Sequence, residues 1–547
     1  MLISLNKKLI CLGKKFINYD VLVAICRSIN LFKHTAMKLS PVKKYGSLFV
    51  LMILAIHTYA QSKSEWIYPD AQGKLVYKAL PAGDKIMDFS YAGYMGGGVS
   101  IPDVPVKATV NPADGDNTDA IQSAIDQVSK MPLVNGLRGA VLLAAGQYSC
   151  SKTLNISASG VVLRGSGSGE KGSVINMTGD PHVCVAVRIR PSVTASGPKT
   201  TLADAYVPSA AKTFNVAGAS GFAVGDIIQI IRPVTPEWLA FMGMDRLVRD
   251  GKKETWVSGE IATERVIQNI SGNSITVTVP LSDSYDAKYT GPVTVQKVTV
   301  KGQESQIGIE NFRIISQAQS VTITQGHNSG INMGGITDGW IRNMEIFNTV
   351  NSVSITGNRI TVDNLSIMHD VPTLGAAKPA DLNGSGSQIL FNNCKITGDN
   401  VFYLATGPKV SGPIVLLNCV FKGGGWIQPH QRWATGLLVD NCQVPNGGIE
   451  FMNRGEMGSG HGWAIGWAVA WNCTAKSFLN QMPPGSANWL IGCKGSIEHG
   501  SMPFEKGAPN LPDGIMDSHN KPVDPQSLYL TQLGERLGKQ ALKNIGY

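Results

Sequence analysis

Charged residues are scarce in this sequence, and the excess of positive charge lies in the first 60 residues. Only 16% of the 547 residues are charged and 43% are hydrophobic, a balance that excludes both a disordered chain and a long coiled coil. Nine of the 48 Lys and Arg, but only one acidic residue, fall within residues 1–60. The other residues carry 39 basic and 38 acidic side chains, so the net charge of +9 does not indicate nucleic-acid binding.

Long hydrophobic runs are also scarce. The apolar run over residues 48–56 is too short to span a bilayer comfortably, but lysines precede it and the small residues Thr58 and Ala60 follow it. This arrangement predicts a secretory signal over about residues 37–60, with residues 1–36 as an over-extended start. We therefore expect a secreted or periplasmic protein whose mature chain has no membrane anchor.

An irregular repeat dominates the C-terminal half. A short apolar run leads each time to Asn and then to Cys or another apolar residue, and no CxxC motif occurs. Strands separated by turn residues indicate a β-solenoid, in which Asn occupies turns and Cys the interior rather than a disulfide or metal site. The markers are Asn311, Asn343, Asn364, Asn393, Asn418, Asn441, Asn472 and Gly492.

The segment that leads into the solenoid is more specific. GDNTDAIQSAID, residues 115–126, predicts a capping helix with Thr118 or Asp119 as its N-cap, and VLLAAGQY and VVLRGSG follow as short strands. With the coil repeat, these segments resemble the entry to the pectate-lyase-like right-handed parallel β-helix proteins of carbohydrate metabolism. The resemblance implies an all-β, right-handed parallel β-helix (solenoid) over residues 61–505.

Two regions depart from the coil pattern. Residues 205–300 contain hairpin strands with Gly272 and Asn273 as a turn, which predicts a β-rich insertion that either covers a substrate or packs on the solenoid. Residues 506–547 form a C-terminal tail. One helical face in the tail predicts a short helix that caps the open end of the solenoid, formed by Leu530, Leu533 and Leu537.

Residues 426–489 concentrate aromatic and ionisable side chains. Six of the ten tryptophans fall there, beside histidines, arginines and glutamates. Aromatic faces next to polar groups suit sugar rings, so we expect a carbohydrate site. Its predicted substrate-binding residues are Trp426, Trp433, Trp463, Trp467, Glu450 and Glu456.

Two histidines in this stretch share one position relative to the repeat. His430 lies 11 residues before Asn441, and His461 lies 11 residues before Asn472. If the loops follow similar paths, the two imidazoles stack on adjacent coils. A lone histidine is more often structural, but two histidines with two arginines favour a functional site.

The residues favour a lyase that cleaves a uronate-containing, acidic polysaccharide by β-elimination. Such an enzyme neutralises the substrate carboxylate, removes the adjacent proton and protonates the leaving oxygen. Arg432 and Arg454 suit the first task, and His430 or His461 suits the other two. Lys422 is a reserve base.

Three alternatives remain open at this stage. A glycoside hydrolase would use two carboxyl groups, for which Glu450 and Glu456 are available. GSGHGWAIG resembles the Gly-His-Gly element of polygalacturonase-type hydrolases, but the paired aspartates that precede that element are missing. A non-catalytic carbohydrate-binding protein is the second alternative. Ca²⁺ assistance is the third, but no acidic cluster has ligand spacing, so we predict no metal or other cofactor.

Overall fold

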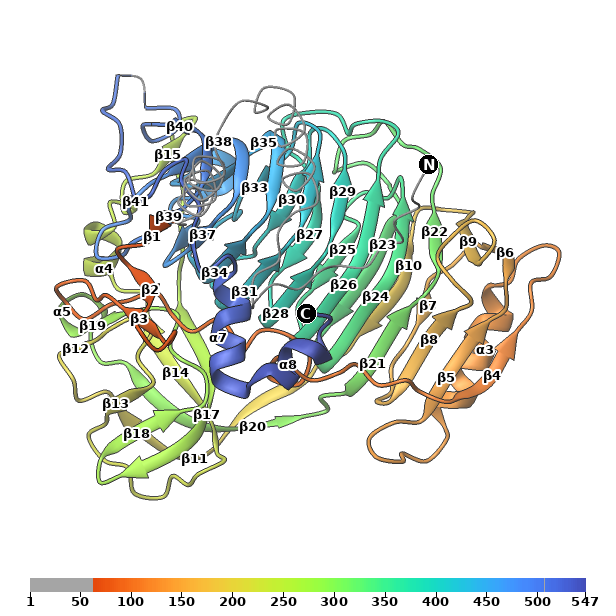
Figure 1. Cartoon of the computed structure of the whole chain (residues 1–547), viewed down its shortest axis with the longest axis horizontal. Coiled ribbons are helices and arrows are strands. Elements are labelled where there is room, and N and C mark those ends of the chain that lie inside the picture. The colour runs from red at the N-terminus through yellow and green to blue at the C-terminus, as the bar shows by residue number, and fades with distance from the viewer. Residues whose placement is uncertain (1–61, 506) are drawn as a thin grey trace, which may run out of the picture. The chain divides into compact units, whose positions relative to one another are not determined.

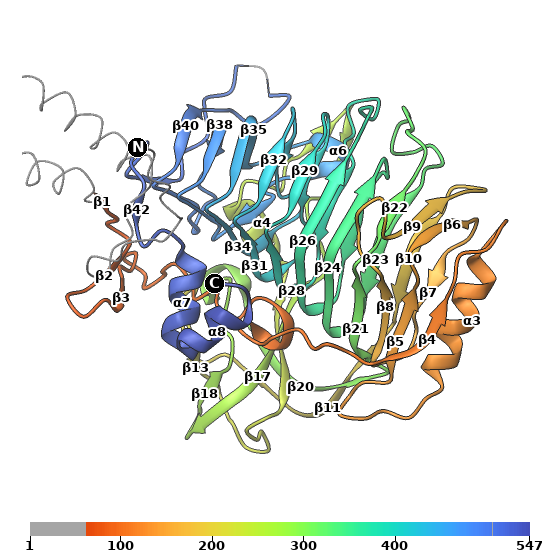
Figure 2. The same ribbon diagram turned by 45° about the vertical axis from the view of Figure 1, so that its right-hand side comes forward.

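Stacked parallel strands form the body of the protein (Figures 1 and 2). The computed structural model describes residues 62–505 and 507–547, so the predicted leader over residues 1–60 lies outside the described residues. The strands run in three parallel ladders that wind around one apolar interior. The predicted all-β parallel β-helix is therefore confirmed. In the part of the chain that is described, no helix is both long and apolar enough to cross a membrane.

The first ladder is the longest, and each strand pairs in parallel with the next. It contains β4(Val106–Val110), β5(Gly139–Leu143), β8(Val161–Gly165), β21(Ser305–Glu310), β24(Thr337–Phe347), β26(Asn358–Met368), β28(Ser387–Asn392), β31(Ser411–Leu417), β34(Ala434–Asp440), β37(Val469–Trp471), β39(Trp489–Ile491) and β41(Ile515–Asp517). The short β36(Ile465–Gly466) also pairs with β34.

The second ladder follows the first around each coil, and the ends of β24 and β26 extend into it. Its other strands are β6(Gly146–Cys150), β9(Ser173–Met177), β22(Arg313–Ile315), β29(Lys395–Thr397), β32(Val420–Lys422), β35(Gln443–Phe451), β38(Thr474–Asn480) and β40(Lys494–Glu498). The third ladder contains β7(Leu154–Asn155), β10(Val183–Arg188), β23(Ser329–Gly334), β25(Val353–Ile355), β27(Ala380–Gly384), β30(Phe402–Ala405), β33(Trp426–Ile427) and the far ends of β35, β38 and β40.

The repeat markers form the corner between the first two ladders. All seven marker asparagines have positive φ, between 50° and 62°, a left-handed conformation that asparagine tolerates better than most residues. Side-chain amides bond from coil to coil, as from Asn343 to Asn311 (2.9 Å) and from Asn441 to Asn418 (2.7 Å). The cysteines that follow the markers are buried free thiols in the interior. Both structural predictions are confirmed.

One helix covers the N-terminal end of the solenoid (Figure 2). In α3(Thr118–Ser129), Ile121, Ile125 and Val128 are buried at helical spacing. The predicted N-cap was wrong by one position, because the helix begins at Thr118 and Asn117 precedes it. The Asn117 side chain bonds the backbone of Ala113 instead of capping the helix.

The C-terminal tail covers the side of the solenoid rather than only its open end, which corrects the predicted cap. Although β41 adds the last strand, α7(Leu528–Leu537) and α8(Lys539–Asn544) pack outside the first ladder (Figure 1). Asp440, at the end of β34, accepts bonds from the Ser527 hydroxyl (2.7 Å) and the Tyr529 amide (2.8 Å). The N-terminal elements lie in the same region, where β1(Ser62–Lys63) pairs with β42(Val523–Asp524). The other N-terminal elements are β2(Ile67–Pro69), β3(Leu75–Tyr77) and η2(Tyr94–Gly96).

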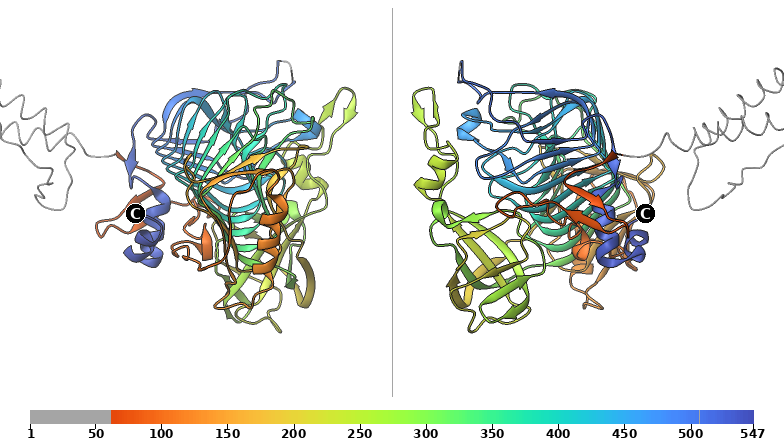
Figure 3. Two further views of the ribbon diagram at one scale, coloured as in Figure 1. Left: turned by 90° about the vertical axis from the view of Figure 1, so that its right-hand side faces the viewer. Right: turned by 60° about the vertical axis from the view of Figure 1, so that its left-hand side comes forward.

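The predicted insertion is present, on a different side of the solenoid from α7 and α8 (Figure 3), but it begins before the predicted residue 205, because its first strand starts at Ser192. Its six-stranded antiparallel sheet encloses a separate core, and the predicted Gly272–Asn273 turn joins β17 to β18. The sheet contains β11(Ser192–Thr201), β20(Thr294–Lys301), β14(Ile227–Pro233), β17(Glu260–Ser271), β18(Ser274–Val277) and β13(Thr213–Asn215). The smaller elements are β12(Tyr206–Val207), β19(Tyr285–Asp286), β15(Val248–Arg249), β16(Lys252–Lys253), α4(Pro236–Phe241) and α5(Ala287–Thr290).

Candidate functional site

The two predicted histidines meet where the chain leaves the third ladder. His430 follows β33, and His461 follows the short α6(Met457–Gly460), which contacts β15 of the insertion (Figure 3). Their ring centroids are 4.6 Å apart, so the predicted contact between adjacent coils is confirmed. Gly458 has φ +63°, and a Cβ there would lie 2.2 Å from His461 Nε2. The loop therefore needs glycine at this position to accommodate the imidazole.

The backbone beside His430 is strained. Arg432 and Trp433 are consecutive residues with φ of 54° and 63°, a rare conformation for long and bulky side chains. The Arg432 amide donates to the His461 carbonyl, and the Trp433 amide donates to the Trp463 carbonyl, both at 3.0 Å. The Arg432 guanidinium donates to the carbonyl and hydroxyl oxygens of Ser459 (2.7 and 2.8 Å). Arg432 therefore ties the histidine loop down, and part of its hydrogen-bonding capacity is already used.

Arg454 is a buried cation in the site, which is unusual for an arginine. Its side chain is buried, with 8% of the residue exposed, and its guanidinium lies 5.4 Å from the Phe402 ring centroid. No described residue forms a hydrogen bond or an ion pair with this guanidinium. Burial lowers its pKa to about 10, so it is still cationic at neutral pH. Glu450 is a carboxylate that acts on this charge, but it forms no ion pair with it, and the buried Nε has no partner among the described residues. A bound anion would supply the hydrogen bonds that Glu450 does not.

Two further polar atoms near Arg454 are buried without a partner among the described residues. They are Nδ1 of His461 and Oε1 of Gln428. The Gln428 amide nitrogen donates to the Glu450 carboxylate, on the neighbouring strand of the third ladder. Burial raises the pKa of Glu450, Glu498 adds to the increase, and Arg454 opposes it. A buried polar group without a partner is normally completed by a ligand or water, so these atoms together indicate a site for a polar ligand.

The two imidazoles are uncharged at neutral pH. Burial and the positive charges of Arg454 and Arg432 lower the pKa of His430 to about 4. Burial, His430 and the same arginines lower the pKa of His461 to about 3. Both rings are therefore unprotonated at pH 7, which is the form a general base needs. Such low pKa values make them weak bases, and a bound anion that offsets the two arginines would raise these pKa values.

Most of the tryptophans predicted to stack on a sugar are buried beneath the insertion, which corrects the expectation of exposed rings. Trp433, Trp463 and Trp467 are 2–3% exposed, because the insertion packs over them. Their indole nitrogens donate to Asp283 of the insertion and, for Trp463, to the Met242 carbonyl. These three rings hold the insertion on the solenoid and cannot all stack on a substrate.

Of the other predicted residues, Trp426 lies beside the strand of Glu450, whereas Glu456 and Lys422 lie at the surface. Trp426 is half-buried, Lys378 Nζ lies 4.9 Å from its ring centroid, and it pairs with the strand that carries Glu450. Glu456 accepts a bond from the Val248 amide (3.3 Å) at the surface. Lys422 is exposed on the second ladder, outside the histidine cluster, so the structure does not bring the reserve base to the site.

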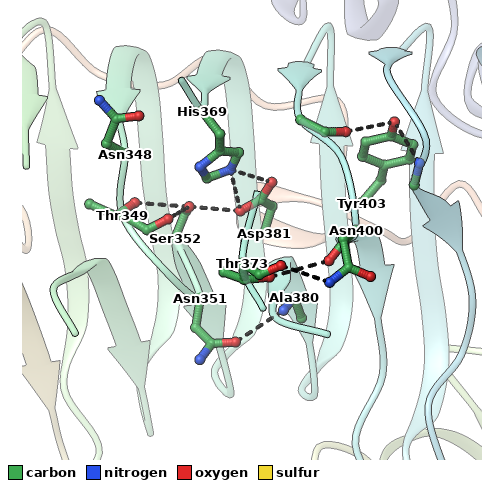
Figure 4. A network of polar contacts seen from close by, with 12 residues as sticks. Asn348, Thr349, Asn351, Ser352, His369, Thr373, Ala380, Asp381, Asn400 and Tyr403 are labelled. Atoms are coloured by element: carbon green, nitrogen blue, oxygen red, sulfur yellow. Dashed lines mark hydrogen bonds and ion pairs between the residues drawn. The ribbon is translucent and has the colours of Figure 1, made fainter. Parts of the chain in front are cut away.

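A second histidine cluster, which the sequence did not indicate, lies a few coils away on the third ladder (Figure 4). His369 Nε2 lies 2.9 Å from Asp381 Oδ2, and the Ser352 hydroxyl donates to Asp381 Oδ1 (2.8 Å). Burial lowers the pKa of His369, but Asp381 and Asp370 together raise it more, so the net shift is upward. Ser352 and His369 both bond the aspartate and not each other, so the three do not form a nucleophilic triad. The network braces a corner of the solenoid.

No group of three or more His, Cys, Asp or Glu within the described ranges is arranged to hold a metal ion. The candidate site is formed by the polar residues around the two imidazoles, and we call it the histidine–arginine cluster. Its members are Gln428, His430, Arg432, Glu450, Arg454 and His461.

Comparisons with known proteins do not place the chain in a family. No protein-family model matches it. No curated protein matches it either. Among solved structures, it is similar to the tailspike protein gp49 of Pseudomonas phage LKA1, with 13% identity, a TM-score of 0.38 and coverage of 71% of this chain and 70% of that chain.

Two further solved structures are similar to the chain at the same low level. A tailspike protein double mutant of E. coli bacteriophage HK620, in complex with a pentasaccharide, has 9% identity and a TM-score of 0.39, with coverage of 82% of this chain and 63% of that chain. The Agl-KA catalytic domain has 8% identity and a TM-score of 0.34, with coverage of 73% and 55%. Such likenesses assign no reaction, and the pectate-lyase-like resemblance stays a prediction.

Proposed function

We propose that the protein binds an acidic polysaccharide at the histidine–arginine cluster and cleaves it by β-elimination. One observation carries this proposal: Arg454, whose buried Nε has no partner among the described residues, lies in the same cluster as two uncharged imidazoles. A uronate supplies what the cluster is missing, because its carboxylate is an anion that a guanidinium binds through two parallel bonds.

The proposed reaction follows from these charges. Arg454 binds the uronate carboxylate and makes the proton on C5 more acidic. His461 or His430 accepts that proton, the C5–H electron pair forms the C4–C5 double bond, and the bond from C4 to the glycosidic oxygen breaks. The imidazolium formed in this way returns the proton to the leaving oxygen, so the products are a 4,5-unsaturated uronate and a new reducing-end sugar hydroxyl. The predicted signal peptide would place this reaction outside the cytoplasm.

The test is the ultraviolet absorbance of unsaturated uronate during incubation of the protein with pectin, alginate, glucuronan and glycosaminoglycans. We expect absorbance to rise with at least one substrate and to survive a chelator, as a route without metal predicts. Arg454→Lys keeps the charge but loses the two-pronged geometry, so it should lower kcat/KM by about tenfold to a hundredfold. No absorbance with any uronate, or unchanged kinetics in Arg454→Lys, would contradict the proposal.

A glycoside hydrolase is the second candidate, and Glu450 is the observation that favours it. Its raised pKa suits a general acid. Glu450 aligns with Leu479, and Leu479 with Glu498, so the two glutamates are two strand spacings apart, roughly 9–10 Å. That figure is a distance between backbones, and side chains on these strands can bring their carboxyl groups to the separation of about 6.5–9.5 Å typical of inverting glycosidases. New reducing ends without unsaturated product, abolished in Glu450→Gln, would establish this alternative; cleavage without either product signature would exclude both.

A further inference from the structure

A cavity of about 360 Å³ lies between the insertion and the solenoid, apart from the histidine–arginine cluster. Its volume is within the range of about 300–1,000 Å³ typical of small-molecule sites. Its walls come from three regions far apart in the sequence: the loop after β3, the insertion, and the solenoid corners at Trp433, Trp467 and Ser486.

The aromatic part of the wall is rigid. Trp433 and Trp467 both donate through their indole nitrogens to the carboxylate of Asp283, at 2.8 and 3.2 Å. Two further rings of the wall, Phe241 and Tyr289, stack with centroids 3.9 Å apart. Rigid aromatic walls of this kind suit the apolar C–H faces of a sugar ring.

The polar part of the wall is buried and incompletely bonded. Arg232 is 2% exposed, with Nη2 3.1 Å from Asp283 Oδ2, and its Nε has no partner among the described residues. The Ser486 hydroxyl is also buried without a partner. Both residues line the cavity, so a bound molecule that carries hydroxyl groups would complete their hydrogen bonding.

The charges of the wall exclude an acidic ligand. One cation, Arg232, faces three carboxylates, Asp84, Asp283 and Asp286. Asp283 balances Arg232, which leaves the other two carboxylates as acceptors. Asp84 is 3% exposed and accepts bonds from the Tyr206 hydroxyl (2.6 Å) and the Ser209 amide (2.7 Å). A uronate would be repelled here, whereas sugar hydroxyls can donate to such oxygens.

We infer that this cavity is a second carbohydrate site, which binds one sugar unit that carries no carboxylate. It is separate from the histidine–arginine cluster, because none of the six cluster residues lines it. The strained pair Arg432 and Trp433 belongs to both regions: the arginine ties down the histidine loop and the indole lines the cavity.

The experiment is isothermal titration calorimetry of the full protein with glucose, galactose, N-acetylglucosamine and glucosamine, against glucuronate and galacturonate. Ala82 is exposed and lines the cavity, so Ala82→Phe should weaken binding at least tenfold by narrowing the site. Ala71→Phe is the matched control, because Ala71 is equally exposed at the turn between β2 and β3 and does not line the cavity. Ser486→Ala removes one hydrogen bond and should weaken binding by about threefold to tenfold.

The outcomes distinguish this site from the histidine–arginine cluster. Binding of a sugar without a carboxylate that is lost in Ala82→Phe and kept in both Ala71→Phe and His461→Ala would support the inference. It would be overturned by no saturable binding, by equal binding of the uronates, or by binding that survives Ala82→Phe and disappears in His461→Ala. Inactivity towards all uronate polymers would contradict the proposed reaction but not this site.

Discussion

Two histidine clusters on the third ladder show opposite environments for the same residue type. At His369, the imidazole faces Asp381, and Ser352 also bonds that aspartate. At His461, the neighbouring ring is another histidine, the nearby charges are arginines, and Nδ1 has no partner among the described residues. The first cluster raises the pKa of its histidine, and the second lowers it to about 3.

This difference separates a brace from a site. Because buried polar groups are normally bonded, a network whose hydrogen bonds are internally complete has little left to offer a ligand. A cluster with unpartnered polar atoms is incomplete until something binds. The number of histidines therefore says less about function than whether their hydrogen bonds are complete within the protein.

The largest expected effect is on turnover. His461→Ala and His430→Ala remove a candidate general base, so kcat should fall by about 10² to 10⁴ while the circular dichroism spectrum stays unchanged. His519→Ala is the control, since that histidine is exposed in the turn that follows β41. Full activity in both variants would remove these histidines from the mechanism.

The next effect is on stability. Asp381→Ala leaves His369 and Ser352 without their common partner, so it should lower the free energy of unfolding by about 3–5 kcal/mol. Urea unfolding measures this loss, and turnover per folded molecule should be unchanged. His461→Ala should cost less than Asp381→Ala, because Nδ1 forms no bond within the described chain. Equal losses would mean that both clusters are braces.

A smaller effect is on the pH dependence of stability, where the two clusters act with opposite sign. The folded pKa of His369 is above 6.5, so its contribution is full below pH 6.5 and is lost as pH rises through the folded value. His461 has a folded pKa of about 3, so its contribution is present above pH 6.5 and is lost as pH falls towards 3. Unfolding between pH 4 and 9 should show a weaker acid loss in His461→Gln and a weaker alkaline loss in His369→Gln. Parallel profiles for both variants would contradict the assignment.

The smallest effect is expected at Lys422. Its side chain is exposed on the second ladder, so Lys422→Ala should change the free energy of unfolding by no more than about 0.5 kcal/mol. Turnover should stay within twofold of the parent protein under the same assay. A loss greater than tenfold would restore this lysine as a base and weaken the case for the imidazoles.

The coils were predictable because each one repeats the same backbone conformation at its corner and the same small interior position. A left-handed corner selects asparagine, and a small interior position selects cysteine, so both recur in the sequence at Asn418, Cys419, Asn441 and Cys442. The contact between His430 and His461 was predictable for the same reason, as their equal offsets from the corner reflect stacked coils.

The rest depends on contacts between distant segments. The packing of Trp433 and Trp463 was missed because Trp238, Met242 and Trp256, which cover them, lie about two hundred residues earlier. No local pattern reports that packing. The pair His369 and Asp381 was missed because its 12-residue separation matches neither the coil repeat nor a known motif.

The position of the insertion has a consequence for the order of folding. Strand β8 pairs with β21 and β10 with β23, so the first coils must find partners about 146 residues further along the chain. Such distant pairing is slow, because the entropy lost in closing the loop precedes any gain from contacts. The insertion has its own core, and its first and last strands, β11 and β20, lie side by side. Because these two strands hold the flanking parts of the solenoid close together, we expect the insertion to fold before β8 and β10 pair with β21 and β23.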